Sequence, residues 1–258
     1  MDVEIFEPSA RLKTVVRNYM VITSGIATPT VVLPHYGFVL AIQFAGSVSI
    51  RKDGNFYKVP AMALSGIRKS ARNFLYESKT STILVMFTET GAAAIFKQPL
   101  ADFFEHAEDL QNLLITSELN SLQDQISAAK TNSKRIAIIE SYLTGKLLEH
   151  PSDILVSSAI TTIHNCYGII PINTLANSHN ISIDAFEKRF KKVVGTTPKQ
   201  FSTLVRLKTL IANGYGKKSL TDLAYEYEFY DQSHFVRQFK SFTGQLPKTF
   251  LKTAYSWQ

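Results

Sequence analysis

The sequence predicts an α+β protein with a β-rich N-terminal domain and an all-α C-terminal domain. Short β-branched and aromatic runs, separated by turn signals, fill roughly the first 90 residues. From Gly91 onward the apolar residues recur at helical spacing instead. The distribution of charged residues also separates the N-terminal part of the chain from its C-terminal part. Residues 1–168 hold 15 Lys/Arg and 15 Asp/Glu, whereas residues 169–258 hold 13 Lys/Arg and 6 Asp/Glu, so the whole basic excess lies in the last third.

The β-rich part predicts a small barrel or sandwich. Between the apolar runs lie turn signals such as Ser24-Gly25, Pro34 and Gly46-Ser47, and Asp53-Gly54-Asn55 predicts a hairpin. Many short strands at even spacing are typical of these two architectures. The strands are expected at residues 17–23, 30–33, 38–44, 48–51, 56–59 and 82–88.

Two amphipathic helical stripes follow the strands. The first begins at Leu110 and continues to Ala129, which closes a domain over residues 1–129. The second predicts an amphipathic linker or dimerisation helix over residues 130–150, because its apolar face must be buried somewhere. Packing on the protein's own barrel is the alternative to a homodimer. The second stripe consists of Ile136, Ile139, Tyr142, Leu143 and Leu147.

Residues 151–258 predict short helices with clear ends. Pro151 closes the preceding segment and Ser152 can cap a new helix whose apolar face ends at Tyr167-Gly168. Later helices are expected to end at Gly195, at Asn213-Gly214 and at Gly244. Their start signals are Pro171, Ser182, Pro198, Ser219 with Asp222, Asp231 and Pro247.

An internal repeat lies within these helices. AFEKRFKKVVGTTPKQF, beginning at Ala185, matches HFVRQFKSFTGQLPKTF, beginning at His234, at an offset of 49. Such self-similarity indicates a duplicated structural unit. In each copy a short helix containing Leu-Ala, a tight turn and a basic amphipathic helix predict a helix-turn-helix. The matching pairs include Phe186/Phe235, Phe190/Phe239, Lys191/Lys240, Gly195/Gly244, Pro198/Pro247 and Phe201/Phe250.

The polar faces of the two basic helices are the candidate DNA-binding site. Lys and Arg bind phosphates, and residues of these types hydrogen-bond base edges. A solvated surface explains any single lysine, but two matching helices that carry the basic excess favour double-stranded DNA as the partner. The outward residues are Glu187, Lys188, Lys191 and Lys192 in the first copy, and Gln232, Ser233, Val236, Arg237 and Lys240 in the second.

Residues from about 152 to 254 resemble the DNA-binding domain of the AraC/XylS family of bacterial transcription regulators. The resemblance is carried by SIDAFEKRFKKVVGTTPKQF, by Val205-Arg206-Leu207 and by FYDQSHFVRQFKSFTGQLP. It implies a transcriptional regulator in which a long helix joins two helix-turn-helix units, each protomer reads two adjacent major grooves, and RNA polymerase is a partner. By the same resemblance the base-facing positions are Asp184, Glu187 and Lys188, then Ser233, Val236 and Arg237.

The chain departs from the family pattern in its two turns. The family usually has glycine there, whereas this sequence has Asn180 and Glu228. Asn tolerates a positive φ and Glu does so poorly, so the second turn is expected to be strained or relaxed. For Arg206, an ion pair that holds the two units together is favoured over a DNA contact.

The β-rich front resembles, more loosely, the cupin-like sensor domains found in this family, which implies control by a small-molecule effector or a partner. The sequence identifies no ligand-binding residue. His35 has no second histidine at a cupin-like spacing, and a metal site needs three or four convergent ligands. We therefore expect no metal and no cofactor.

The alternative function is a DNA-alkylation-repair or response protein that uses Cys166 as its alkyl acceptor. Cys166 ends an apolar helical face without an adjacent Lys or Arg, so a structural thiol is favoured and no catalytic residue or enzyme activity is expected. The longest apolar run, residues 83–87, is far too short for a membrane span, and no secretory signal is visible. These features predict a cytoplasmic protein without a membrane partner.

Overall fold

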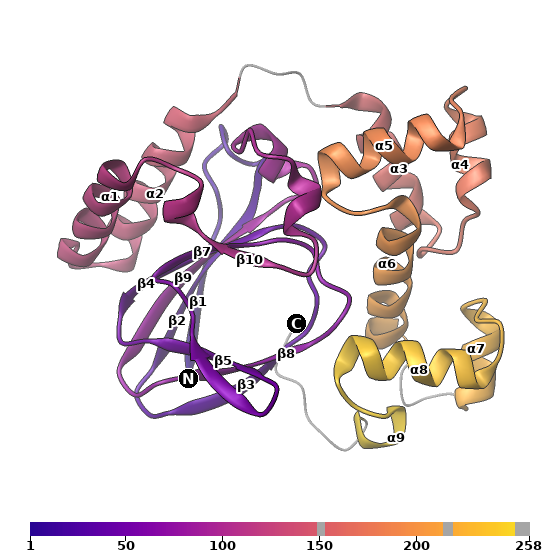
Figure 1. Ribbon diagram of the computed structural model, residues 1–258, viewed down its shortest axis with the longest axis horizontal. Helices are drawn as coiled ribbons and strands as arrows, with labels where there is room; N and C mark the ends of the chain where they lie inside the picture. The colour runs from indigo at the N-terminus through magenta and orange to yellow at the C-terminus, as the bar shows by residue number, and fades with distance from the viewer. Residues whose placement is uncertain (149–152, 214–218, 251–258) are drawn as a thin grey trace.

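The computed structural model describes residues 1–148, 153–213 and 219–250, and it confirms the α+β class (Figure 1). Antiparallel strands form two sheets, one in the order β1-β2-β9-β4-β7-β10 and the other in the order β3-β8-β5-β6. The larger sheet contains β1 (Asp2–Phe6), β2 (Val16–Ser24), β9 (Thr80–Phe87), β4 (Val39–Ala45), β7 (Met62–Ser65) and β10 (Ala107–Asp109). The smaller sheet contains β3 (Thr28–Val32), β8 (Arg72–Tyr76), β5 (Val48–Lys52) and β6 (Asn55–Lys58).

All six strands expected from the sequence are present, as β2, β3, β4, β5, β6 and β9. The hairpin is confirmed as well. β5 pairs directly with β6, and Asp53 and Gly54 have positive φ angles of 50° and 85°, as a tight hairpin turn requires. The sequence does not predict β1, β7, β8 or β10. These strands have three to five residues, and β1 is almost wholly exposed, so their pairing partners define them more than their own side chains do.

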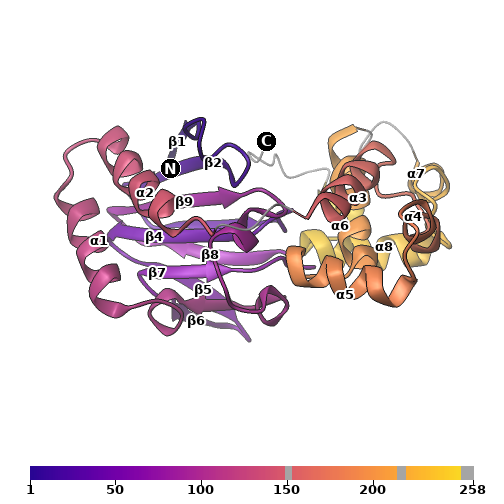
Figure 2. The same cartoon turned by 90° about the horizontal axis from the view of Figure 1, so that it is seen from above.

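Helices α1 (Thr116–Ala128) and α2 (Asn132–Lys146) pack on the larger sheet, at the end of the molecule remote from the C-terminal helices (Figure 2). A short 3-10 turn, η3 (Leu110–Asn112), precedes α1 where the sequence suggests continuous helix. Ile136, Ile139 and Leu143 of α2 are buried in the same hydrophobic core as the sheet. The apolar stripe therefore covers the protein's own barrel, which removes the reason for assigning it to a dimer.

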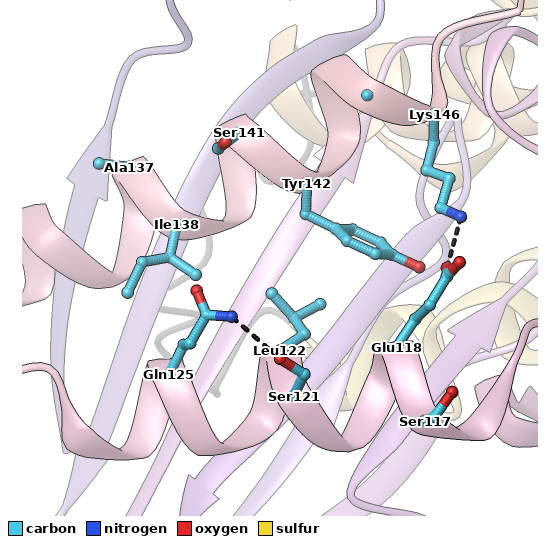
Figure 3. A pocket seen from close by; sticks show the side chains of 11 residues that line it. Ser117, Glu118, Ser121, Leu122, Gln125, Ala137, Ile138, Ser141, Tyr142 and Lys146 are labelled. Carbon is cyan, nitrogen blue, oxygen red and sulfur yellow. Dashed lines mark hydrogen bonds and ion pairs between the residues drawn. The ribbon is translucent and has the colours of Figure 1, made fainter.

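The outer faces of α1 and α2 enclose an open groove of about 790 Å³ (Figure 3). Lys146 of α2 forms an ion pair with Glu118 of α1 across this groove, and Gln125 donates a hydrogen bond to Ser121. The two charged side chains of the groove thus neutralise each other.

The C-terminal part is entirely helical in the described residues. Asp153 caps its first helix by accepting a hydrogen bond from Val156 N at 3.0 Å. Pro151, Ser152 and Gly214, expected to mark helix ends, lie outside the described residues. None of the described helices is long and apolar enough to cross a membrane. The helices are α3 (Ile154–Asn165), α4 (Ile172–Ser178), α5 (Ile183–Val194), α6 (Pro198–Asn213), α7 (Leu220–Glu226), α8 (Gln232–Thr243) and α9 (Pro247–Phe250).

The two domains share an interface. The hydrophobic cluster of the C-terminal helices takes in Ile67 and Phe104 from the N-terminal domain. Beside it, Glu89 Oε1 accepts hydrogen bonds from Arg17 at 2.8 Å and from His164 Nε2 of α3 at 3.0 Å. Burial alone would raise the pKa of Glu89, but the hydrogen bond with His164 and the charge of Arg17 lower it to about 2. An ionised Glu89 therefore joins the two domains at neutral pH.

His35 lies at the same interface. Its Nδ1 accepts a hydrogen bond from Gly37 N at 3.2 Å. Burial, followed by the positive charges of Lys208 and Arg17, lowers the pKa of His35 to about 3, although the charge of Glu89 acts in the opposite direction. His35 is therefore neutral in the folded protein well below the pH at which an exposed histidine is protonated.

This histidine predicts a stability that falls in mild acid. Between pH 6.5, the ordinary pKa of histidine, and pH 3, the unfolded chain binds a proton on His35 and the folded chain does not. The free energy of unfolding should therefore decrease as the pH falls, by at most about 1.4 kcal/mol per pH unit from this residue. His35→Asn keeps an acceptor for Gly37 N and should flatten the slope. Urea unfolding across this range measures it, and equal slopes in the two proteins would contradict the assignment.

Candidate nucleic-acid interface

The C-terminal domain contains two helix-turn-helix units of the same geometry. The first is α4 with α5, and the second is α7 with α8; α6 joins them. Figure 1 shows α5 and α8 at opposite ends of α6, with α4 and α7 on the side away from the sheets. We call α5 and α8 the reader helices, because each occupies the place of a recognition helix in its unit.

Phenylalanine rings hold each reader helix to its unit. In α5 the rings of Phe186 and Phe190 meet with their centroids 5.8 Å apart, and Phe190 meets Phe201 of α6 at 5.7 Å. The second unit repeats this arrangement at 5.6 and 5.2 Å. Most of the residues that the sequence repeats therefore belong to the hydrophobic core of the two helix-turn-helix units. We call these two sets the phenylalanine triads: Phe186, Phe190 and Phe201, and Phe235, Phe239 and Phe250.

Both reader helices begin and end as the sequence predicts. Ser182 Oγ accepts a hydrogen bond from Ala185 N at 3.3 Å, and Asp231 Oδ1 accepts one from His234 N at 2.6 Å. These side chains satisfy amide groups that the first turn of a helix leaves without an internal partner. At the other end, Gly195 and Gly244 adopt left-handed conformations, with φ angles of 82° and 77°.

The turns between paired helices are two copies of one backbone motif. Asn180 and Glu228 have positive φ angles of 51° and 49°. In the first turn Ile181 N bonds back to Ala176 O at 3.1 Å, and in the second Phe229 N bonds back to Ala224 O at 2.8 Å. This is the Schellman ending of a helix, in which glycine is the favoured left-handed residue. Glu228 thus occupies a conformation that its side chain disfavours.

Arg206 of α6 supports the second turn. Its Nη1 donates hydrogen bonds to Glu228 O at 3.2 Å and to Tyr227 O at 3.4 Å, and its guanidinium lies 4.6 Å from the centre of the Phe229 ring. Arg206 therefore links α6 to the second unit, but through backbone carbonyls and an aromatic ring rather than through the expected ion pair. Because these carbonyls end α7, a cation beside them is favourable.

The first reader helix presents a mixed surface to solvent. Asp184, Lys188, Lys191 and Lys192 are exposed, whereas Glu187 is half-buried. Arg189, which sequence reasoning does not single out, is tied to Asp153 at the start of α3 by an ion pair of 2.5 Å. The acidic residues lie in the first half of α5 and the lysines dominate its second half.

The second reader helix presents polar and basic residues without an acid. Gln232, Ser233, Arg237 and Lys240 are exposed. Val236 is half-buried and packs against the hydrophobic cluster of the domain, so less of it is available for a base than the resemblance implies. The exposed Arg237 and Lys240 are the basic groups of this surface.

Two exposed tyrosines border the second reader helix and are absent from the sequence-based candidates. Tyr225 of α7 is 88% exposed, and Tyr230, just before the cap Asp231, is 92% exposed. Their phenol hydroxyls are of the kind that hydrogen-bond phosphates. Helical spacing is the signal that could have identified Tyr225, because it lies off the buried face formed by Leu223 and Ala224.

Two features would indicate chemistry other than DNA binding, namely a metal-binding cluster and a reactive cysteine. No group of three or more His, Cys, Asp or Glu residues that could hold a metal ion occurs in the part of the chain that the structure describes. Cys166 is half-buried at the C-terminal end of α3, and no hydrogen bond or ion pair joins its thiol to another described residue.

Both reader helices end against the N-terminal domain. A Cβ atom added at Gly195 would lie 2.9 Å from Leu100 O and 2.9 Å from the ring of Phe38, closer than such atoms can approach. At Gly244 the nearest neighbour would be Ala71 Cβ at 3.7 Å, which is ordinary contact. The C-terminal end of the first reader helix therefore lies closer to the N-terminal domain than the corresponding end of the second.

Comparison with known proteins gives a family match to part of the chain. A profile described as helix-turn-helix domain covers residues 175–253, which include both turns and both reader helices. No curated protein matches the sequence.

Among solved structures, the chain is similar to a substituted apo form of ToxT from Vibrio cholerae strain SCE256, with 11% identity and a TM-score of 0.47 over 91% of this chain and 97% of that chain. It is also similar to the C-terminal domain of AraT, a response regulator from Geobacillus stearothermophilus, with 15% identity and a TM-score of 0.37 over 41% of this chain and 92% of that chain. For the AraC-like transcriptional activator CuxR the identity is 11% and the TM-score 0.28, over 83% of this chain and 88% of that chain.

The left-handed turn at Glu228 generates a test of stability. Glu228→Gly should raise the free energy of unfolding by about 0.5–1 kcal/mol, because relief of the left-handed strain exceeds the entropy that glycine adds to the unfolded chain. Asn180→Gly is the matched control and should change it by less, since asparagine tolerates this conformation. Urea unfolding of the full chain measures both. A Glu228→Gly protein no more stable than the parent would mean that the second turn is relaxed.

Proposed function

We propose that this chain is a DNA-binding transcriptional regulator of the AraC/XylS type and that one protomer reads two adjacent major grooves; the helix-turn-helix match over residues 175–253 supports this proposal. In this proposal α5 and α8 each enter one groove. The residues that contact DNA are those of the two polar faces: Asp184, Glu187, Lys188, Lys191 and Lys192 on α5, and Gln232, Ser233, Val236, Arg237 and Lys240 on α8.

The duplication of one complete unit within one chain is the observation that carries this proposal. Each reader helix has its own cap, its own turn and its own phenylalanine triad, so neither unit is a degenerate copy. The joining helix α6 has 16 residues, which corresponds to about 24 Å. With a reader helix about 10 Å thick at each end, the separation approaches the roughly 34 Å between successive major grooves on one face of DNA.

The two reader helices contribute differently in this proposal. The acids at the start of α5 repel phosphates, although a carboxylate can accept a hydrogen bond from cytosine N4. The surface of α8 combines Arg237 and Lys240 with neutral donors and carries no acid. We therefore expect α8 to supply more of the affinity and α5 to contribute mainly discrimination between sequences.

Arg237 and Lys240 should have separable effects on DNA binding. Arg237 can bond guanine O6 and N7 together, so Arg237→Ala should cost about 1–3 kcal/mol on the preferred site and relax selectivity at one base pair. Lys240→Ala should weaken binding to all sequences alike and reduce the salt slope by about one unit. Titrations on specific and random duplexes at several salt concentrations measure both effects.

Thermal melting is the control for these two variants. Phe235 and Phe239 are fully buried and hold α8 in place, so loss of an exposed basic side chain should leave the melting temperature unchanged. Equal relative losses on specific and random duplexes for Arg237→Ala would overturn its base-reading role.

The site on DNA should reflect the head-to-tail order of the two units. We expect two half-sites per protomer, in direct rather than palindromic order, with centres about 10–10.5 base pairs apart. Hydroxyl-radical footprinting on a selected duplex should then protect two consecutive stretches on one face of the helix. Protection of a single groove per bound protomer would contradict the proposal.

A further inference from the structure

Arg189 is a cation of the first reader helix that lies outside the polar face predicted from the sequence. It follows Lys188, and successive residues of an α-helix are about 100° apart around the helix axis. Phe186 and Phe190 are fully buried and mark the inward side of α5, whereas Lys188 is exposed on the opposite side. Arg189 therefore lies on one flank of the helix.

The flank of a helix that occupies a major groove faces the wall of that groove. The wall is formed by the sugar-phosphate backbone, and arginine is one of the residues that contact phosphate oxygens there. The side chain of Arg189 is 47% exposed, so another molecule can reach its guanidinium. By position and by chemistry Arg189 is suited to bind a phosphate.

The guanidinium of Arg189 already has a partner within the protein. Its Nε donates a hydrogen bond to Asp153 Oδ2 at 2.5 Å, which forms an ion pair between α5 and the start of α3. The two helices are in contact, as Figure 1 shows. Asp153 is the first described residue after Leu148, so this carboxylate lies where the chain enters the helical domain.

The carboxylate of Asp153 has two separate roles. Its Oδ1 accepts a hydrogen bond from Val156 N at 3.0 Å and caps α3, while its Oδ2 binds Arg189. Asparagine caps a helix about as well as aspartate does, but it carries no charge. One substitution can therefore remove the ion pair and keep the cap.

Arg189 differs in this respect from the other Lys and Arg side chains of the two reader helices. The others are exposed, and none of them forms an ion pair with a described residue. Among the described residues of these helices, Arg189 is thus the one Lys or Arg held by a carboxylate. The others are Lys188, Lys191 and Lys192 of α5, and Arg237 and Lys240 of α8.

We propose that Asp153 is an intramolecular counter-ion that competes with DNA phosphate for Arg189. While the ion pair is formed, α5 binds DNA without Arg189. When the pair is broken, Arg189 adds a phosphate contact on the flank of the groove. This inference rests on the proposed function, since it requires α5 to lie in a groove.

The competition between the two anions is close. Ion pairs with solvent-exposed members are weak, and a phosphate oxygen offers a guanidinium the same kind of charge-assisted hydrogen bond as a carboxylate oxygen. Arg189 is therefore divided between Asp153 and the phosphate when DNA is bound. Because a phosphate contact carries no base information, Asp153 lowers the affinity of the first unit for all sequences alike.

Equilibrium binding to a selected duplex, compared in four proteins, tests the competition. Asp153→Asn should tighten binding about threefold and steepen the salt dependence by up to about one unit, because Arg189 is then free. Arg189→Gln should weaken binding about twofold in the parent and about sixfold in Asp153→Asn, a coupling of about threefold between the two residues. The double variant and the two single variants complete the cycle with the parent.

Asp124→Asn is the matched control for the change in net charge. Asp124 is an exposed carboxylate of α1, at the end of the molecule remote from the helical domain (Figure 2). Its loss should change the affinity less than about 1.5-fold, because salt screens charges at such separations. If Asp153→Asn leaves the affinity unchanged, or tightens binding equally with and without Arg189, the proposal is overturned.

Elution from immobilised heparin separates this inference from the proposed function. Heparin is a polyanion without bases, and its sulfates present oxygen acceptors to a guanidinium as phosphates do. Asp153→Asn should elute at higher salt than the parent and than Asp124→Asn, and Arg189→Gln should abolish the difference. If this pattern appears while no duplex is bound, the proposed function is wrong and the competition for Arg189 stands. If a duplex is bound and neither assay couples Asp153 to Arg189, the competition is wrong and the proposed function stands.

Discussion

Edge-to-face and tilted ring contacts within the phenylalanine triads hold both helix-turn-helix units together. Each triad buries three large rings completely or almost completely, and each ring comes from a position that the sequence repeats. Because the rings face inward at i and i+4 along each reader helix, they fix which residues face outward. The polar surfaces are thus a consequence of the packing. In the proposed function, substitutions on those surfaces alter DNA recognition and leave the fold intact, whereas loss of a triad ring removes a contact that positions the reader helix.

The N-terminal domain is more than an attachment to this helical unit. Glu89 joins Arg17 to His164, and side chains from the sheet domain complete the hydrophobic cluster of the helices. The interface therefore contains both an apolar surface and a charged Glu89 that is largely shielded from solvent, beside a half-buried His164 and an exposed Arg17. Separation of the two domains would break the hydrogen bond between Glu89 and His164 and would expose part of the hydrophobic cluster to water. The sheets and the helices are therefore in direct contact.

The sequence carried most information where structure is set locally. The caps Ser182 and Asp231 and the duplicated phenylalanines depend on neighbours a few residues away, and they were predicted correctly. The short strand β10 depends on distant partners and leaves no periodic signal of its own. For the same reason the sequence could not reveal the ion pair of Arg189, whose partner Asp153 is 36 residues away in the chain. Arg206 is intermediate, because its linking role was predictable and its carbonyl partners were not.

If the chain reads two grooves as proposed, the unequal clearance at Gly195 and Gly244 would influence which operators one protein accepts. The end of α5 is wedged against the sheet domain, while the end of α8 has ordinary contact distance to spare. If the two half-sites in a promoter were one base pair closer together or further apart, α8 would have to move to reach its half-site. In that case α5 would keep its position against the N-terminal domain. The second helix-turn-helix unit would then determine how much variation in half-site spacing the protein tolerates. Promoters that differ in this spacing would be distinguished chiefly by how α8 binds the second half-site.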